Sequence, residues 1–143
     1  AKLAGKYNVS IVGRLDPVKG HETFIRAAAL VSKIVPEAFF YVIGGEKNVK
    51  INLLKSLADQ SGLKNIVFTG FVENAVSYMR ASDAGVIASS GSEAVSRAAA
   101  EWMACAKPLV STRAGCLGEL VEDGRSGLLV APGDHAAMAS AIE

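Results

Sequence analysis

The chain has 143 residues, half of them apolar and a fifth charged, a composition that is ordinary for one α/β domain with a buried sheet. The formal net charge is only +1 and the basic residues form no run, so we expect no nucleic-acid partner. No apolar run approaches the ~20 residues of a membrane span. Cys105 and Cys116 have neither metal-ligand nor disulfide spacing. We therefore expect a cytoplasmic protein in which both cysteines act as small apolar residues.

Short apolar runs alternate along the chain with segments of helical pattern. Their nearly continuous Val, Ile, Phe and Leu content is typical of strands that are buried on both faces, as in a parallel sheet. In chain order, the predicted strands are 8–13, 39–44, 65–70, 84–88, 108–111 and 127–130.

The helix predicted after the first strand has the clearest pattern. Residues 21–35 carry Phe24, Ala28 and Val31 at helical spacing, and the helix is expected to end before Pro36. The other predicted helical segments are 52–61, 72–82, 96–105, a brief turn near Glu119 and a last segment from Asp134.

Strand–helix alternation repeated this often predicts a single doubly wound, Rossmann-like α/β fold, with a mostly parallel sheet and helices on both faces. No internal repeat, low-complexity stretch or linker interrupts the pattern, so we expect residues 1–143 to form one domain. Because the chain begins almost directly on a strand and stops where a helix is expected, we also expect a further domain outside it.

Small or hydroxylated residues finish five successive predicted strands, at 13–14, 44–45, 70–71, 89–91 and 111–112. In open α/β sheets, ligands bind outside the carboxyl ends of the strands. Each of these residues alone also fits an ordinary turn. Five such ends at one edge of the sheet predict a ligand-binding crevice with exposed backbone N–H groups.

The loop at 13–20 places Arg14 and Lys19 just ahead of a predicted helix. A helix N-terminus favours an anion, a guanidinium grips phosphate oxygens with two donors, and an ammonium adds a mobile charge. The loop matches neither the Walker pattern nor the GxGxxG fingerprint. Taken alone, the two residues are more often solvated loop charges, but their place at this edge makes them candidates to bind phosphate.

A second candidate segment leads into a helix that carries Glu101 next to Trp102 and Met103, on its apolar side. If the stretch from Glu93 to Glu101 were all helical, the two residues would lie ~12 Å apart along the axis. That is about the reach needed to touch two hydroxylated rings on either side of a diphosphate, and carboxylates make strong hydrogen bonds to sugar hydroxyls. Alternatively, Glu93 only complements the helix dipole and Glu101 is a surface charge.

Several short motifs, in a specific order, resemble one known family over nearly the whole chain. They are Val12-Gly13-Arg14-Leu15, Lys19-Gly20, Phe68-Thr69-Gly70-Phe71, Ser92-Glu93, Glu101-Trp102-Met103-Ala104, Gly118-Glu119-Leu120-Val121, Asp123-Gly124 and Gly127-Leu128-Leu129-Val130. In these motifs the chain is similar to the C-terminal domain of the group 1 (family 4) retaining glycosyltransferases. Those enzymes adopt the GT-B fold of two facing Rossmann-like domains, of which this chain would be the C-terminal half.

For the donor nucleotide, the resemblance implies contacts at two of the strand ends. Gly13, Arg14 and Lys19 would hold the donor diphosphate, and Gly70 with Phe71 would lie beside the base. The donor would be a nucleotide sugar that is bound without a metal or another cofactor. This expectation agrees with the absence of an Asp-x-Asp pair from the sequence.

For the two sugars of the donor, the resemblance implies that Glu101 binds the ribose and that Glu93 contacts the transferred sugar as the catalytic residue. Where the family commonly has Gly-Phe-Gly after the first glutamate, this chain has Ala94-Val95-Ser96. Ser96 would still offer an amide and a hydroxyl to the donor. Arg97 fits an anionic donor group and plain solvent exposure equally well.

We therefore interpret the chain as the donor-binding domain of a retaining glycosyltransferase. The acceptor, such as a polysaccharide or lipopolysaccharide precursor, would be held by an N-terminal domain that this chain lacks, so the chain alone is expected to show no turnover. Any membrane contact would be made by the full-length enzyme, at the inner face of the membrane. The alternatives are another GT-B nucleotide-sugar enzyme, such as an epimerase, and a non-catalytic nucleotide-binding module.

Overall fold

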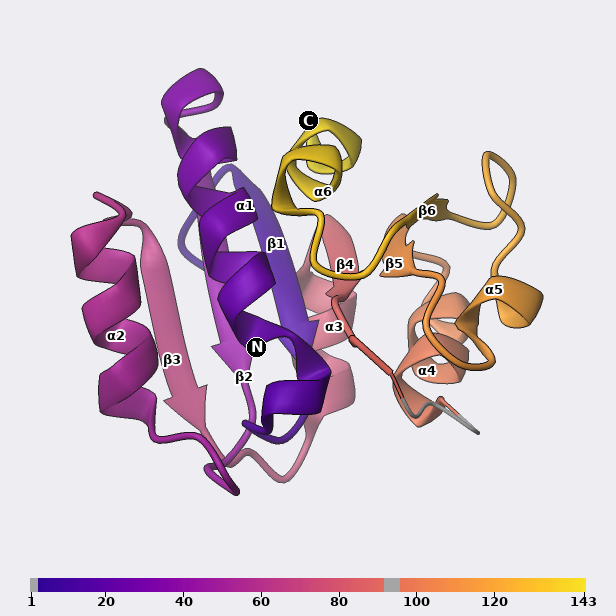
Figure 1. Ribbon diagram of the computed structural model, residues 1–143, viewed down its shortest axis with the longest axis horizontal. Coiled ribbons are helices and arrows are strands. Elements are labelled where there is room, and N and C mark those ends of the chain that lie inside the picture. The colour runs from indigo at the N-terminus through magenta and orange to yellow at the C-terminus, as the bar shows by residue number, and fades with distance from the viewer. Residues whose placement is uncertain (1–2, 92–95) are drawn as a thin grey trace.

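The computed structural model describes residues 3–91 and 96–143, and within them six strands form one sheet (Figure 1). The strands are β1 (Tyr7–Val12), β2 (Ala38–Ile43), β3 (Ile66–Gly70), β4 (Ala84–Ile87), β5 (Leu109–Thr112) and β6 (Leu128–Val130). They follow the order β3-β2-β1-β4-β5-β6, and all neighbouring pairs are parallel. The predicted strands and the doubly wound parallel sheet are confirmed, with strand ends that differ from the prediction by at most one residue.

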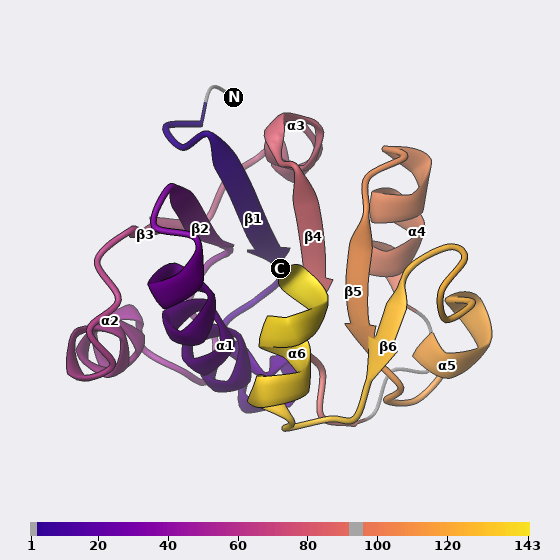
Figure 2. The ribbon, with the colours of Figure 1, turned by 90° about the horizontal axis from the view of Figure 1, so that it is seen from above.

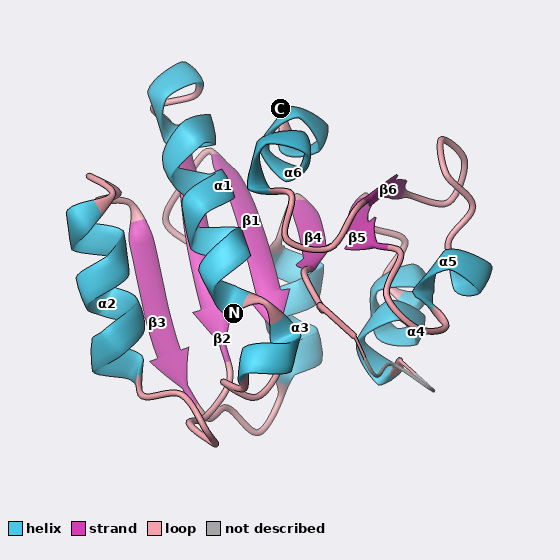
Figure 3. Cartoon of the chain, in the orientation of Figure 1, coloured by secondary structure: helices cyan, strands magenta, loops and turns pink. Residues whose placement is uncertain are grey.

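The helices cover both faces of this sheet. They are the 3-10 helix η1 (Pro17–Lys19), α1 (His21–Ile34), α2 (Ile51–Gln60), α3 (Ala75–Ala81), α4 (Arg97–Ala104), α5 (Leu117–Leu120) and α6 (His135–Ile142). Figure 2 shows α1, α2 and α6 on one side of the sheet and α3 and α4 on the other. Figure 3 distinguishes the helices from the strands by colour. None of the helices within the described residues has the length and apolar character needed to cross a membrane.

The third helix begins three residues later than predicted, at Ala75 instead of Val72. The reason is its N-terminal cap, because the side-chain oxygen of Asn74 accepts a hydrogen bond of 3.2 Å from the backbone N–H of Ser77. Asparagine at this position satisfies an N–H group that the helix itself leaves unbonded. The cap residue therefore outweighs the apolar spacing that suggested an earlier start.

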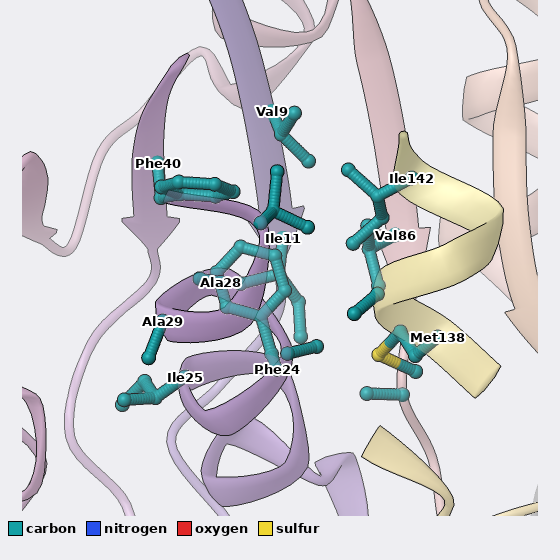
Figure 4. Close-up of a cluster of buried hydrophobic side chains, with 14 of the residues drawn as sticks. Val9, Ile11, Phe24, Ile25, Ala28, Ala29, Phe40, Val86, Met138 and Ile142 are labelled. Atoms are coloured by element: carbon teal, nitrogen blue, oxygen red, sulfur yellow. The ribbon is translucent and has the colours of Figure 1, made fainter. Parts of the chain in front are cut away.

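The larger part of the core lies between the sheet and the pair α1 and α6. Phe24 of α1 meets Phe40 of β2 edge-on, with the ring centroids 6.1 Å apart, and both side chains are fully buried. Figure 4 shows Ile11 of β1 and Met138 of α6 among the buried side chains between these elements. Burying a side chain of this size stabilises the fold by about 1.5–3 kcal/mol. This packing holds the N-terminus of α1 in place against the sheet.

The opposite face is built around Trp102 of α4, which is fully buried. Gly85 of β4 lies directly under its ring, since a Cβ at this position would come within 2.3 Å of the indole. The helix therefore packs against the strand backbone itself. Met103 was expected on the apolar side of this helix, but it is 41% exposed, because the next residue of a helix points about 100° away from Trp102.

The hydroxyl groups of Ser111 and Thr112, at the end of β5, are buried and bonded to backbone carbonyls. Ser111 and Thr112 are fully buried, and Ser89 is nearly so. The Thr112 hydroxyl donates to the carbonyl of Ser89 at 2.7 Å, and the Ser111 hydroxyl donates to the carbonyl of Thr112 at 2.9 Å. The sequence predicted that small or hydroxylated residues at the strand ends leave room for a ligand. The hydroxyl groups of Ser111 and Thr112 satisfy backbone carbonyls that burial removes from water.

Candidate functional site

The loop between β1 and α1 is tied to the loop that follows β2. Leu15 is fully buried, and its N–H donates to the carbonyl of Gly45 at 2.9 Å. Its carbonyl accepts hydrogen bonds from the N–H groups of Lys47, Asn48 and Val49, at 3.3, 3.1 and 3.0 Å. Because the two loops share these bonds at the carboxyl edge of the sheet, the position of Arg14, next to Leu15, is set by the fold.

Asp16 strengthens the same connection with its side chain. One carboxylate oxygen accepts from the N–H of Val18 at 3.2 Å and caps η1, and the other accepts from the Asn48 amide at 2.7 Å. The hydrogen bond from Asn48, followed by that from Val18, lowers the pKa of Asp16 below its ordinary value. The carboxylate is thus ionised at neutral pH, and it holds the short 3-10 helix in front of α1.

The N-terminus of α1 is pressed against the end of β4 at Gly20. This residue has a left-handed backbone, with φ of 71°, and a Cβ here would lie 1.8 Å from the carbonyl oxygen of Ala88. The N–H of Ser90 donates to the carbonyl of Val18 at 2.8 Å across the same junction. A residue other than glycine would therefore force the two segments apart. The arrangement presents the positive end of a 14-residue helix at the carboxyl edge.

The predicted phosphate-binding residues differ in their surroundings. Arg14 is exposed, whereas Lys19 is partly buried and lines a small cavity of about 20 Å³ together with Ser96. A Cβ on Gly13 would lie 3.9 Å from Cδ of Lys19, so these two residues are neighbours. The fold thus brings Lys19, which neighbours Gly13, beside Ser96, although Ser96 lies far along the sequence.

Ser96 is the N-cap of α4, and its side-chain oxygen accepts from the N–H of Ala99 at 3.1 Å. Glu101 lies one turn further along, with its side chain 33% exposed and 3.7 Å from Nε of Arg97. Glu93 lies outside the described residues. The condition of one continuous helix from Glu93 to Glu101 is not met, because Ser96 has an extended backbone (φ −110°, ψ 103°) and α4 begins at Arg97. The distance between the two carboxylates stays a prediction.

Gly70 and Phe71 lie at the same carboxyl edge of the sheet, where β3 ends. The carbonyl of Gly70 accepts from the N–H of Gly44 at 3.2 Å. The ring of Phe71 is largely in solvent, with 79% of the residue exposed, and its Cβ lies 3.3 Å from where a Cβ on Gly45 would stand. An exposed phenylalanine beside two glycines offers a flat apolar surface on which a planar ring can stack.

Sequence reasoning missed the two side chains that hold the loop, Asp16 and Asn48, although Asp16 before Pro17 has the pattern of a helix N-cap followed by proline at the first helical position. It also missed the buried imidazole of His21, for which the sequence offers no signal. Among the described residues, no cluster of three or more His, Cys, Asp or Glu side chains could hold a metal ion.

Comparison with known proteins shows which protein family this chain matches. The family model described as "Glycosyl transferases group 1" matches residues 6–143. D-inositol 3-phosphate glycosyltransferase of Arthrobacter sp. is 35% identical over 132 residues, which cover 89% of this chain and 31% of that protein. An uncharacterized glycosyltransferase of Methanocaldococcus jannaschii is 34% identical over 128 residues, or 87% of this chain and 34% of that protein. The chain thus spans about a third of the length of these relatives.

Solved structures agree with this comparison. HepE of Anabaena, in complex with UDP and glucose, is 30% identical and has a TM-score of 0.88 over 96% of this chain and 38% of its own. The C-terminal domain of a group 1 glycosyltransferase, LpcC of Francisella tularensis, is 34% identical and has a TM-score of 0.83 over 95% of this chain and 73% of its own. The neighbours are GT-B glycosyltransferases, and the chain corresponds to the C-terminal half of that fold.

Proposed function

Because the chain belongs to the group 1 glycosyltransferases, we propose that it binds the nucleotide-sugar donor of an enzyme that transfers the sugar with retained anomeric configuration. The observation that carries the proposal is the N-terminus of α1 at the carboxyl edge of the sheet, with Arg14 and Lys19 in the loop before it. This arrangement suits an anion. HepE, which is described with UDP and with UDP-glucose, supports a nucleoside diphosphate as that anion.

Each part of the donor would be held by a different strand end. Arg14 and Lys19 would bind the diphosphate, with Gly13 leaving room for it, and the exposed ring of Phe71 beside Gly70 would stack against the base. The two cations would also act on the reaction, because negative charge builds up on the diphosphate as the bond to the sugar breaks. No metal is needed in this scheme.

The two carboxylates would bind the sugars at either end of the diphosphate. Glu101 would accept hydrogen bonds from the ribose hydroxyls, and Glu93 would contact the transferred sugar as the catalytic residue. Ser96 would offer its hydroxyl proton to the donor, since its oxygen already accepts from Ala99. Arg97, which lies 3.7 Å from Glu101, would help to orient that carboxylate.

The acceptor would come from outside this chain, in a second domain facing the carboxyl edge. The chain covers about a third of its relatives, which leaves room for such a domain in the whole enzyme. Closure of two domains positions both substrates and excludes water. We propose a hydroxyl of a cell-envelope polysaccharide or lipopolysaccharide precursor as the acceptor group, reached by the full-length enzyme on the cytoplasmic side of the membrane.

The experiment compares UDP and uridine by calorimetry. Arg14→Ala and Lys19→Ala should each weaken UDP binding by roughly 10-fold to 100-fold, because a hydrogen bond to a charged group is worth about 1.5–3 kcal/mol, while uridine binding changes little. Arg125→Ala, which removes an exposed arginine far from this loop in the sequence, should leave both affinities unchanged. Equal losses for UDP and uridine would contradict a role in phosphate binding.

A further inference from the structure

The loop between β2 and α2, residues 44–50, is bonded to both of the segments that are proposed above to hold the base and the diphosphate of the donor. On one side it meets the end of β3. The N–H of Gly44 donates to the carbonyl of Gly70 at 3.2 Å, and a Cβ on Gly45 would lie 3.3 Å from Cβ of Phe71. The loop therefore adjoins the residue whose exposed ring is proposed to stack on the base.

On its other side the loop is bonded to the segment that carries Arg14. The N–H of Leu15 donates to the carbonyl of Gly45 at 2.9 Å, and the carbonyl of Leu15 accepts from the N–H groups of residues 47–49 at 3.0–3.3 Å. Leu15 and Glu46 also form a short parallel bridge. One short loop thus contacts the phosphate-binding segment and the end of β3 at the same time.

A side-chain hydrogen bond extends this connection toward Lys19. The Asn48 amide donates to one oxygen of the Asp16 carboxylate at 2.7 Å. The other oxygen accepts from the N–H of Val18, the residue before Lys19, at 3.2 Å. Asn48 is exposed, so its replacement can loosen this contact while the backbone hydrogen bonds of the loop remain.

The far end of the loop is held at the start of α2. The Glu46 carboxylate accepts from the N–H of Ile51 at 2.6 Å and lies 3.8 Å from the ammonium group of Lys50. The helix α2 in turn packs against α1. Since hydrogen bonds fix the loop at both ends and along one side, it acts as a spacer between the ends of β1 and β3.

We propose that the loop 44–50 sets the spacing between the diphosphate site at Arg14 and Lys19 and the base site at Phe71, with Asn48 as a positioning residue. The proposal rests on the proposed function. A ligand that occupies two linked sites gains affinity when their spacing matches its own length, because the second contact then forms at a high effective concentration. Asn48 therefore contributes to the binding of the whole nucleotide and not to that of its separate parts.

The test compares UDP, which spans both sites, with uridine and with pyrophosphate, which each reach one site. Asn48→Ala should weaken UDP binding roughly 3-fold to 10-fold and leave the affinities for uridine and pyrophosphate unchanged, as measured by calorimetry for UDP and by nuclear magnetic resonance titration for the two weaker ligands. A residue that contacts the donor gives another pattern. Arg14→Ala should weaken UDP and pyrophosphate together, and Phe71→Ala should weaken UDP and uridine together.

Matched variants separate the hydrogen bond from charge and from folding. Asn52→Ala removes another exposed asparagine, on α2, and should leave all three affinities unchanged. Asn48→Asp would set two carboxylates against each other and weaken UDP binding. Adding Asp16→Asn to that variant again pairs one amide with one carboxylate, and it should recover most of the lost UDP affinity. Urea unfolding of each variant measures whether the fold itself has changed.

Three results would overturn the proposal. The first is unchanged UDP affinity in Asn48→Ala, and the second is an equal loss for UDP and for either of the smaller ligands. The third is no recovery of UDP affinity when Asp16→Asn is added to Asn48→Asp. In each case the proposed function still stands if Arg14→Ala and Lys19→Ala weaken UDP binding. If those two variants bind UDP like the native chain, both proposals are wrong.

Discussion

The buried imidazole of His21 predicts a fold that loses stability in mild acid. In the folded chain the ring is neutral until about pH 4, whereas in the unfolded chain it takes up a proton near pH 6.5. Below pH 6.5 the unfolded state therefore binds more protons than the folded state, and lowering the pH favours unfolding. The contribution of the neutral His21 ring to the free energy of unfolding is fully present above pH 6.5, and it is lost as the pH falls toward 4.

The size of the effect follows from the two pKa values. The difference between 6.5 and about 4 corresponds to roughly 3 kcal/mol when the group is fully titrated. Between pH 7 and pH 4.5, about 2 kcal/mol of this amount is lost. With a typical urea slope of about 1.5 kcal/mol per molar, the unfolding midpoint should fall by more than roughly 1 M on this account alone.

Urea unfolding at pH 7 and pH 4.5, followed by the fluorescence of Trp102, measures this loss, because Trp102 is the single tryptophan and is fully buried. Carboxylates also titrate in this range, so the native chain is compared with His21→Phe, which keeps an aromatic ring and has no proton to take up. Between pH 7 and pH 4.5, the free energy of unfolding of His21→Phe should fall by about 2 kcal/mol less than that of the native chain. His135→Gln, at an exposed position, should behave like the native chain. Identical pH dependence of the native chain and His21→Phe would refute the reasoning.

The other predictions concern the donor site and the packing behind it. Glu101→Gln should weaken the binding of UDP and of UDP-glucose equally, whereas Glu93→Gln should weaken the binding of UDP-glucose alone. If calorimetry shows an equal loss of UDP affinity in both variants, the assignment of one carboxylate to each sugar is wrong. Gly85→Ala should destabilise the chain by about 1–3 kcal/mol or more in urea unfolding, since its Cβ would meet the indole of Trp102, and Gly91→Ala, with open space around it, should not. The 143-residue chain should bind donor without transferring sugar over many cycles, and sustained transfer by the purified chain would show that no second domain is needed.

The sequence alone determined the order and the type of the elements. Apolar runs without alternation indicated strands that are buried on both faces, and the parallel sheet follows from the helices between them. It also placed Gly13, Arg14, Gly70 and Phe71 at strand ends, because each of these residues directly follows or ends an apolar run. Such features depend on neighbours in the chain, and a local pattern is enough to reveal them.

Only the tertiary structure decided which side chains face one another. It turned the hydroxyl groups of Ser111 and Thr112 toward backbone carbonyls, and it brought Lys19 beside Ser96, 77 positions further along. It also buried His21, the first residue of α1, although nothing near this residue in the sequence marks it as buried. The physical reason is that burial and hydrogen bonding at a strand end depend on elements that arrive from elsewhere in the chain, and their arrangement is set by the packing of the whole core.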